Sequence, residues 1–322
     1  MTHDTSTPFT RLVGCEVPIQ LAPIGSAGQV PRLSLAVARA GAHAIYPGVL
    51  LSAADLGRDI DALRAGTASF GVNFIAPLVD RECLELAAHR APMVDFFYGD
   101  PTPELVEVVH RGGALASWQV GSLDEALAAV ECGCDMLVAQ GIEAGGRIRG
   151  RLELARLLDA VVGAVDVPVL AAGGIGSAAD VAAAMAAGAD GVRVGTRFVA
   201  AEEADAHPAW QRALVHADAG EAVVTRTFAA GVPDFPHRVL QRSLDGAARH
   251  DDDAVGTVPT RHGGRRSLPL YSAETAGRGF EGHVEATAFY AGLSVEHVQA
   301  VLPAAEIVAE LAAGVPAGER VR

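Results

Sequence analysis

Apolar and polar residues follow a repeating order along the chain, in which a short apolar run precedes a longer helical stretch. The runs are bounded by glycine, proline or polar residues, as buried parallel strands are. Ser52, Ser122 and Ser177 each precede a helical stretch, at the position of a helix N-cap. The predicted strands are residues 19–24, 42–46, 70–75, 94–98, 114–119, 136–140, 168–172 and 191–195.

Strand–helix units of this size and number predict fold class α/β, with a (β/α)8 TIM barrel. A doubly wound open sheet is the alternative, because Gly174, Gly176 and Ala179 match the G-x-G-x-x-A dinucleotide pattern after a strand. In such a sheet the next strand should end in an acidic residue that holds a ribose. Here it runs into Gly195-Thr196 instead, so the barrel is favoured.

The strand–helix order stops after the last of these units. Segment 249–266 is rich in charge, glycine and proline, which predicts an exposed loop. The stretches 283–292 and 304–313 have helical character. We therefore predict two domains, a barrel over residues 1–207 and a smaller C-terminal helical cap over residues 208–322.

Composition excludes several classes of protein. A formal net charge of −14 argues against a nucleic-acid partner, because phosphate contacts need a basic face. No apolar run approaches the ~20 residues of a membrane span, and the N-terminus lacks a signal-peptide layout, so we expect a cytoplasmic protein without a membrane partner. All 25 basic residues are arginine, which rules out lysine Schiff bases and a Walker A loop. Cys132 and Cys134 are spaced too closely for the usual zinc motifs, so no metal is expected.

Glycines follow the seventh and eighth predicted strands. In α/β barrels these two loops commonly form a phosphate site at the C-terminal face. Gly173-Gly174 follows one strand and Gly195-Thr196 ends the other. Glycine lets backbone N–H groups approach phosphate oxygens, and the helix that starts after Gly176 adds a favourable dipole. The two loops therefore predict a ligand that carries phosphate.

Several segments resemble, in order and spacing, those of the nitronate monooxygenase family. They are residues 18–23 (PIQLAP), 70–73 (FGVN), 140–146 (QGIEAGG), 171–175 (AAGGI), 194–198 (VGTRF), 290–292 (YAG) and 303–307 (PAAEI). The resemblance implies a barrel that binds FMN at its C-terminal mouth, beneath a smaller helical domain. It also implies an FMN-dependent oxidoreductase that oxidises a nitronate, or a similar anionic carbanion-like substrate, with oxygen.

The same resemblance implies which residues bind FMN. Ala22 and Pro23 would run beneath the isoalloxazine ring. Asn73 and Gln140 would contact the ring or the ribityl chain, because an amide offers both a donor and an acceptor. The residues implied for the ribityl chain and phosphate are Gly145, Gly173, Gly174, Arg193, Val194, Gly195 and Thr196.

Arg147 departs from the family pattern, which has a catalytic histidine after Ala-Gly-Gly. Arginine stays protonated, so it cannot act as a general base. It can bind a carboxylate or a nitronate through two parallel hydrogen bonds. We expect Arg147 to be either an anion clamp near the flavin or part of a solvent-facing basic rim with Arg149 and Arg151.

Alternatives to nitronate oxidation stay open at the level of sequence. They are an NAD(P)H-using FMN enoyl reductase, a phosphate-binding barrel without flavin, and a flavin-binding protein without the family's activity. His237 and His262 in the C-terminal segment could reach the barrel mouth, although nothing in their spacing requires it. We expect a small-molecule substrate and a possible homodimer.

Overall fold

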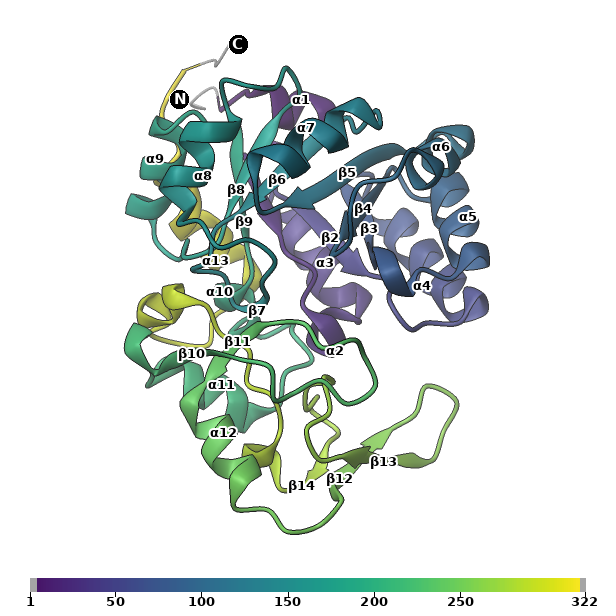
Figure 1. Cartoon of the computed structure of the whole chain (residues 1–322), viewed down its shortest axis with the longest axis vertical. Helices are drawn as coiled ribbons and strands as arrows, with labels where there is room; N and C mark the ends of the chain where they lie inside the picture. Colours follow the sequence, from purple (N-terminus) through teal and green to yellow (C-terminus); the bar gives the residue numbers. More distant parts are fainter. Residues whose placement is uncertain (1–4, 319–322) are drawn as a thin grey trace.

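The computed structural model describes residues 5–318, and its centre is a closed barrel of eight parallel strands. Neighbouring strands follow one another along the chain, and the last pairs with the first, which closes the ring (Figure 1). This confirms the predicted TIM barrel. The barrel strands are β1 (Ile19–Leu21), β2 (His43–Pro47), β3 (Phe70–Ile75), β4 (Met93–Phe97), β5 (Leu115–Val120), β6 (Met136–Gln140), β8 (Val169–Ala172) and β9 (Gly191–Val194).

Helices cover the outside of the barrel, and three of them begin at the predicted caps. Ser52, Ser122 and Ser177 each accept a hydrogen bond from the backbone N–H three residues later. These bonds satisfy N–H groups that have no partner inside the helix. The outer helices are α3 (Pro31–Arg39), α4 (Ala53–Gly66), α5 (Arg81–Arg90), α6 (Pro103–Gly112), α7 (Leu123–Glu131), α8 (Leu154–Val161) and α9 (Ala178–Ala186).

The N-terminal end of the barrel is closed by α1 (Pro8–Val13), where Phe9 is fully buried. Phe9 packs in one cluster with Ile45, Met136 and Leu170, which belong to three barrel strands. The opposite end of the barrel faces most of the segment that follows β9, including α11, α12 and the β12–β14 sheet in the lower half of Figure 1. A ligand site is therefore expected at that end only, where the C-terminal ends of the strands lie.

Two small sheets lie outside the barrel, and all their strands follow β9 except β7, which lies between β6 and β8 in the chain. One has the strand order β10-β11-β7 and the other β13-β12-β14. The prediction of a helical cap therefore left out these strands. The division of the chain into two domains at residue 207 stays a prediction. The elements are β7 (Gly146–Arg147), β10 (Ala222–Thr225), β11 (His237–Leu240), β12 (Ala254–Pro259), β13 (Arg265–Pro269), β14 (Glu281–Gly282), α10 (Thr196–Val199), α11 (Pro208–Val215), α12 (Gln241–Ala248) and α13 (Ala304–Ala312).

Two predictions in this segment are wrong in detail. Residues 249–266, expected to be a loop, form most of the β12–β13 hairpin, in which Val258 and Leu268 are buried. Residues 283–292, expected to be a helix, contain only the short turn η3 and then an extended stretch, in which Tyr290 pairs with β11. Tertiary pairing overrides helical propensity there. The remaining short elements are α2 (Gly25–Gly28), η1 (Ala76–Leu78), η2 (Ala219–Glu221), η3 (Val284–Ala286) and η4 (Leu293–His297).

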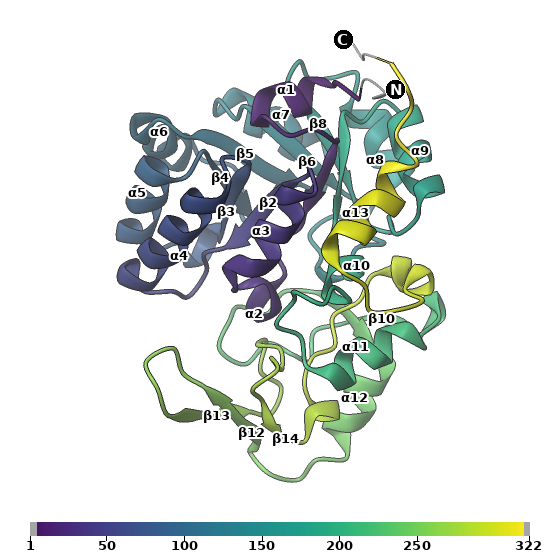
Figure 2. The same cartoon turned by 180° about the vertical axis from the view of Figure 1, so that it is seen from behind.

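The last helix, α13, returns to the barrel and packs beside α3 and α9 (Figure 2). Its buried residues Ile307, Val308 and Leu311 join the main hydrophobic core. The predicted helix at 304–313 is thus confirmed, although it belongs to the outer layer of the barrel. Within the described residues, no helix has the length and apolarity needed to cross a membrane.

Candidate active site

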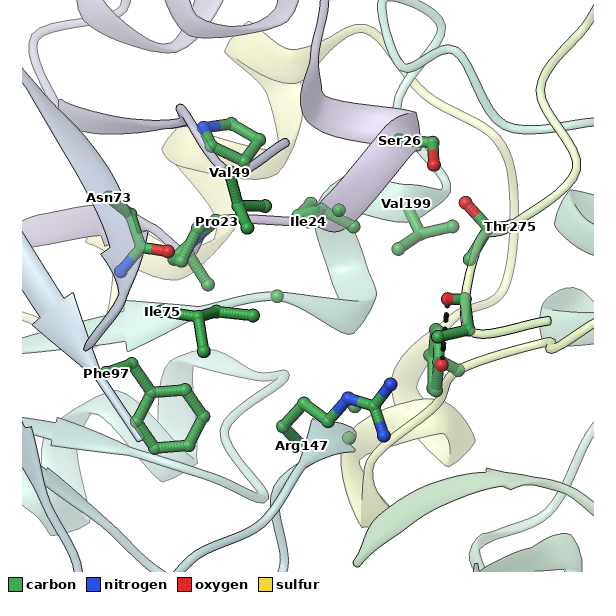
Figure 3. A pocket seen from close by; sticks show the side chains of 18 of the residues that line it. Pro23, Ile24, Ser26, Val49, Asn73, Ile75, Phe97, Arg147, Val199 and Thr275 are labelled. Carbon is green, nitrogen blue, oxygen red and sulfur yellow. Dashed lines mark hydrogen bonds between the residues drawn. The ribbon is translucent and has the colours of Figure 1, made fainter. Parts of the chain in front are cut away.

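A cavity of about 590 Å³ lies between the C-terminal ends of the barrel strands and the two small sheets (Figure 3). Its volume falls in the range typical of cofactor and substrate sites. Every residue predicted for the site lines this cavity except Val194. Successive side chains of β9 alternate in direction, so Arg193 faces inward while Val194 is buried in the hydrophobic core.

Unpaired backbone donors mark one end of the cavity. The N–H groups of Gly174, Gly195 and Thr196 make no hydrogen bond with any described residue. Gly173 and Gly174 have positive φ values of 102° and 72°, which favour glycine. Free N–H groups at a concave wall suit phosphate oxygens, so these residues fit the phosphate of a flavin nucleotide.

A carboxylate of α9 occupies two N–H groups near the predicted phosphate site. The side-chain Oδ2 of Asp180 accepts the backbone N–H groups of Gly176 and Ser177 at 3.0 and 2.9 Å. The helix begins at Ala178, so these two N–H groups lie just before its first turn. The predicted contribution of the α9 dipole to phosphate binding stays a prediction.

Gly145 permits a close approach of two loops at the cavity wall. A Cβ atom on this residue would lie 2.3 Å from the backbone nitrogen of Gly292 and 2.5 Å from the carbonyl carbon of Ala291. Both neighbours are backbone atoms, so neither can move aside as a flexible side chain would. The sequence 140–146 therefore needs glycine at this position for steric reasons.

We expect Gly145→Ala to lower the midpoint of thermal unfolding by several degrees and to weaken flavin binding at least tenfold, because overpacking typically costs about 1–3 kcal/mol. Thermal melts and flavin titration of the apoprotein measure both effects. Gly163→Ala is the matched control, since nothing lies within 4 Å of its added Cβ. Equal melting temperatures for the two variants would contradict the steric role.

A buried ion pair forms the floor of the cavity. The Arg193 guanidinium donates to both carboxylate oxygens of Asp95, at 2.7 and 3.1 Å. It also donates to Oε1 of Gln20 at 2.6 Å and to Oε1 of Gln119 at 2.9 Å. Four of the five guanidinium N–H groups therefore have protein partners, so Arg193 supports the floor of the cavity. Its predicted contact with the flavin stays a prediction.

Two amides of the same network keep one polar atom free. Asn73 donates its Nδ2 to Asp95 at 2.7 Å, and no described residue bonds its Oδ1. Gln119 uses its Oε1 for Arg193, and no described residue bonds its Nε2. Both residues line the cavity, so they offer one acceptor and one donor to a bound ring. Gln119 was not among the residues predicted to contact a flavin, although its place at the end of a strand matches that of Asn73.

Gln140 holds the loop that follows it. Its Nε2 donates to the backbone oxygen of Arg147 at 3.0 Å, and its Oε1 accepts the backbone N–H of Arg149 at 3.4 Å. Both ends of the amide are therefore engaged by the chain itself. Gln140 therefore holds the backbone of Arg147 in place, and its predicted contact with the flavin stays a prediction.

Arg147 extends into the cavity from the short strand β7, as Figure 3 shows. Its guanidinium donates to the carbonyl oxygens of Phe235 and Phe228 at 3.3 and 3.5 Å. It also lies 5.8 and 6.0 Å from the ring centroids of Phe235 and Tyr290. No carboxylate of the described residues forms an ion pair with it, so its positive charge is free to bind an anion.

The basic rim is not formed as expected. Arg149 is 18% exposed and pairs with the carboxylates of Glu125 and Asp100. Arg151 is exposed and does not line the cavity. Arg147 therefore lines the cavity, whereas Arg149 and Arg151 do not. This geometry supports an anion clamp over a basic rim.

Neither His237 nor His262, the two histidines considered as candidates to reach the barrel mouth, lines the cavity. His262 lies at the tip of the β12–β13 hairpin, where its Nε2 is 3.4 Å from Oδ2 of Asp55 on the barrel. His237 is fully buried behind Arg147. Burial lowers its pKa to about 4, so it is neutral near pH 7. No group of three or more His, Cys, Asp or Glu suited to a metal occurs among residues 5–318.

The fold and the cavity define a barrel enzyme whose site lies at the carboxyl ends of its strands. The sequence profile described as nitronate monooxygenase matches residues 79–314. The chain belongs to the nitronate monooxygenase family.

Individual relatives carry several names. The chain is 32% identical over 243 residues to a hydroxy-methyl-oxo-octahydroindene-carboxyl-CoA dehydrogenase of Mycobacterium tuberculosis, covering 74% of this chain and 67% of that protein. It is 31% identical over 245 residues to a nitronate monooxygenase of Paraburkholderia phytofirmans, covering 73% and 64%.

Among solved structures, FabK from Thermotoga maritima matches with a TM-score of 0.76 and 28% identity, covering 96% of each chain. A nitroalkane oxidase from Streptomyces ansochromogenes matches with a TM-score of 0.74 and 27% identity, covering 96% and 98%. Family membership makes the protein a flavin-dependent oxidoreductase with a small-molecule substrate.

Proposed function

We propose that the protein is an FMN-dependent oxidoreductase that oxidises a nitronate, or a similar anionic carbanion-like substrate, with oxygen. The observation that carries this proposal is the position of Arg147, a permanent cation in the cavity without an acidic partner. An anion that enters the cavity can bind the Arg147 guanidinium without displacing a carboxylate from it. Binding therefore gains a charge-assisted contact without losing one inside the protein.

FMN is the flavin that the phosphate end of the cavity favours. Gly174, Gly195 and Thr196 would hold its phosphate through their free N–H groups, while Asn73 and Gln119 would meet the ring. When bound, FMN supplies the electron acceptor for the substrate and the donor for oxygen. The remaining predicted contacts, from Ala22, Pro23, Gly145 and Gly173, are steric, because each of these residues lines the cavity without a polar side chain.

Proton abstraction from a neutral nitroalkane is not supported by the cavity. No described lining residue is a histidine. The acidic side chain there belongs to Glu274, which pairs with Arg266. Burial raises the pKa of Tyr290, so its hydroxyl stays protonated near pH 7. An already ionised nitronate needs no base, which is why it is the favoured substrate.

A visible spectrum tests the cofactor, and anaerobic reduction tests the reaction. We expect purified protein to show flavin absorbance and to release FMN, not FAD, on denaturation. Ethylnitronate is expected to bleach the bound flavin, whereas neutral nitroethane reduces it at least 100-fold more slowly, because no base lines the cavity. A colourless protein that binds no added FMN would contradict the cofactor, and equal rates for the two substrates would contradict the role of charge.

An NAD(P)H-using enoyl reductase is the second candidate, and the likeness to FabK over 96% of both chains favours it. Anaerobic addition of NADPH separates the two candidate functions. NADPH should reduce the bound flavin at a rate compatible with turnover only if the protein is a reductase. If neither donor reduces the flavin, a flavin-binding protein without the family's activity becomes the better account. The cytoplasmic location and the homodimer stay predictions.

A further inference from the structure

His237 connects the two ends of the segment 228–235, which forms one wall of the cavity. Within that segment, Ala230, Gly231 and Val232 line the cavity. Nε2 of His237 accepts the backbone N–H of Phe228 at 3.2 Å. Its Nδ1 lies 2.8 Å from the carbonyl oxygen of Phe235. We call this pair of hydrogen bonds, from His237 to Phe228 and to Phe235, the His237 clasp.

The partners of the ring determine its tautomer. A backbone N–H is always a donor, so Nε2 must accept and carry no proton. In the neutral ring Nδ1 then carries the proton and donates to Phe235. Nη1 of Arg147 is 3.0 Å from the same nitrogen, but a protonated Nδ1 cannot accept from it. The guanidinium therefore uses the carbonyl oxygens of Phe228 and Phe235, the two residues that the ring joins.

We propose that His237 is a positioning residue, which acts through the His237 clasp to hold the Arg147 guanidinium in the cavity as an anion site. This inference rests on the proposed function only in that Arg147 binds the substrate anion. The backbone places the two residues opposite each other, since His237 of β11 pairs with Arg147 of β7. Without the clasp, the carbonyl groups that hold the guanidinium lose their fixed spacing.

His237 is not a replacement for the family's catalytic histidine. Its side chain is fully buried and does not line the cavity. Both ring nitrogens are engaged, so neither can take a proton from a substrate. The groups that face the ring are the Arg147 cation, the Tyr290 ring at 5.7 Å and the Phe228 ring at 6.2 Å. The Arg226–Asp234 ion pair lies in the same segment and is exposed.

The test compares three substitutions in the full chain. His237→Leu removes both hydrogen bonds, His237→Asn keeps a donor for Phe235, and His237→Gln keeps an acceptor for Phe228. We expect His237→Leu to speed amide hydrogen exchange in residues 226–236 by at least about tenfold, the effect of losing a hydrogen bond or two. Nitrite, a planar anion, is expected to bind the flavin-loaded His237→Leu variant about tenfold more weakly than wild type. For ethylnitronate as substrate, KM should rise while kcat changes little. His237→Asn and His237→Gln should fall between wild type and His237→Leu.

His250→Leu is the matched control, because its ring bonds the backbone oxygen of Ala254 and does not line the cavity. It should change neither exchange in 226–236 nor nitrite affinity. Unchanged exchange and affinity in His237→Leu would overturn the proposal, as would a large loss of kcat at unchanged affinity. If His237→Leu does not fold, His237→Asn and His237→Gln decide the outcome. Hydrogen exchange needs no flavin chemistry, so it tests the clasp even if the proposed reaction is wrong.

Discussion

Replacing Asp95 by alanine is expected to lower the free energy of unfolding by about 3–5 kcal/mol, the usual cost of removing one partner of a buried ion pair. Asp95 and Arg193 are 0% and 3% exposed. Asp95 accepts hydrogen bonds from Arg193, Asn73 and Ser117. Its loss would leave the Arg193 cation without a counter-charge inside the barrel, where the side chain is almost fully buried.

Urea denaturation followed by circular dichroism measures this change, with Glu107→Gln as the control. Glu107 forms an exposed pair with Arg111 at 3.7 Å, so its replacement should cost less than about 0.5 kcal/mol. The double variant Asp95→Ala, Arg193→Met removes both charges. Its loss should be smaller than the sum of the two single losses. Additive losses would mean that the two residues stabilise the barrel independently, against the geometry.

Most of the barrel could be predicted because the signal is local. A strand buried on both faces is a continuous apolar run, and 70–75 and 136–140 coincide with β3 and β6. The two small sheets outside the barrel were missed for the opposite reason. β13 is largely exposed and carries two arginines, and β7 has only two residues, so neither shows a pattern of its own. Their strand character comes from the partner that they pair with.

The same distinction applies to the site. Gly145 was predicted from the family resemblance and Gly173 and Gly174 also from their place after a strand, and the structure shows a close approach at the first and positive φ at the other two. Their contact with a flavin stays a prediction. The ion pair of Arg193 with Asp95 could not be predicted, since the two residues lie 98 positions apart along the chain. Sequence gives the position of such a residue on a strand. The sequence does not say whether the side chain contacts the ligand or stabilises the buried network beneath the cavity.

Arg147 illustrates how one departure from the family pattern changes the chemistry that this position can perform. The strand pairing, the glycine loop and the Gln140 hydrogen bond all place residue 147 at the cavity wall. A histidine there could exchange a proton near pH 7, whereas arginine offers a fixed positive charge. Under the proposed function, the site would bind an anion but would lack a base to create one from a neutral acid.

Replacing Arg147 by alanine is expected to lower kcat/KM for ethylnitronate by about 10²–10³-fold, the effect of removing a preorganised charge at a reacting group. Arg147→Lys keeps the charge but not the planar fork, so we expect an intermediate loss. Arg151→Ala is the control on the same loop, because Arg151 is exposed and outside the cavity. Unchanged affinity and turnover in Arg147→Ala would show that Arg147 is not an anion clamp.

Arg147→His distinguishes charge from proton transfer. Anion affinity of the wild type should be constant between about pH 6 and pH 9, because arginine does not titrate there. In Arg147→His the affinity for ethylnitronate should fall as pH rises through about 6.5, where an ordinary histidine loses its charge. Above that pH the neutral imidazole can accept a proton, so turnover of neutral nitroethane should appear in this variant and not in wild type. A wild type that consumes nitroethane as fast as Arg147→His would mean that another group in the cavity is the base.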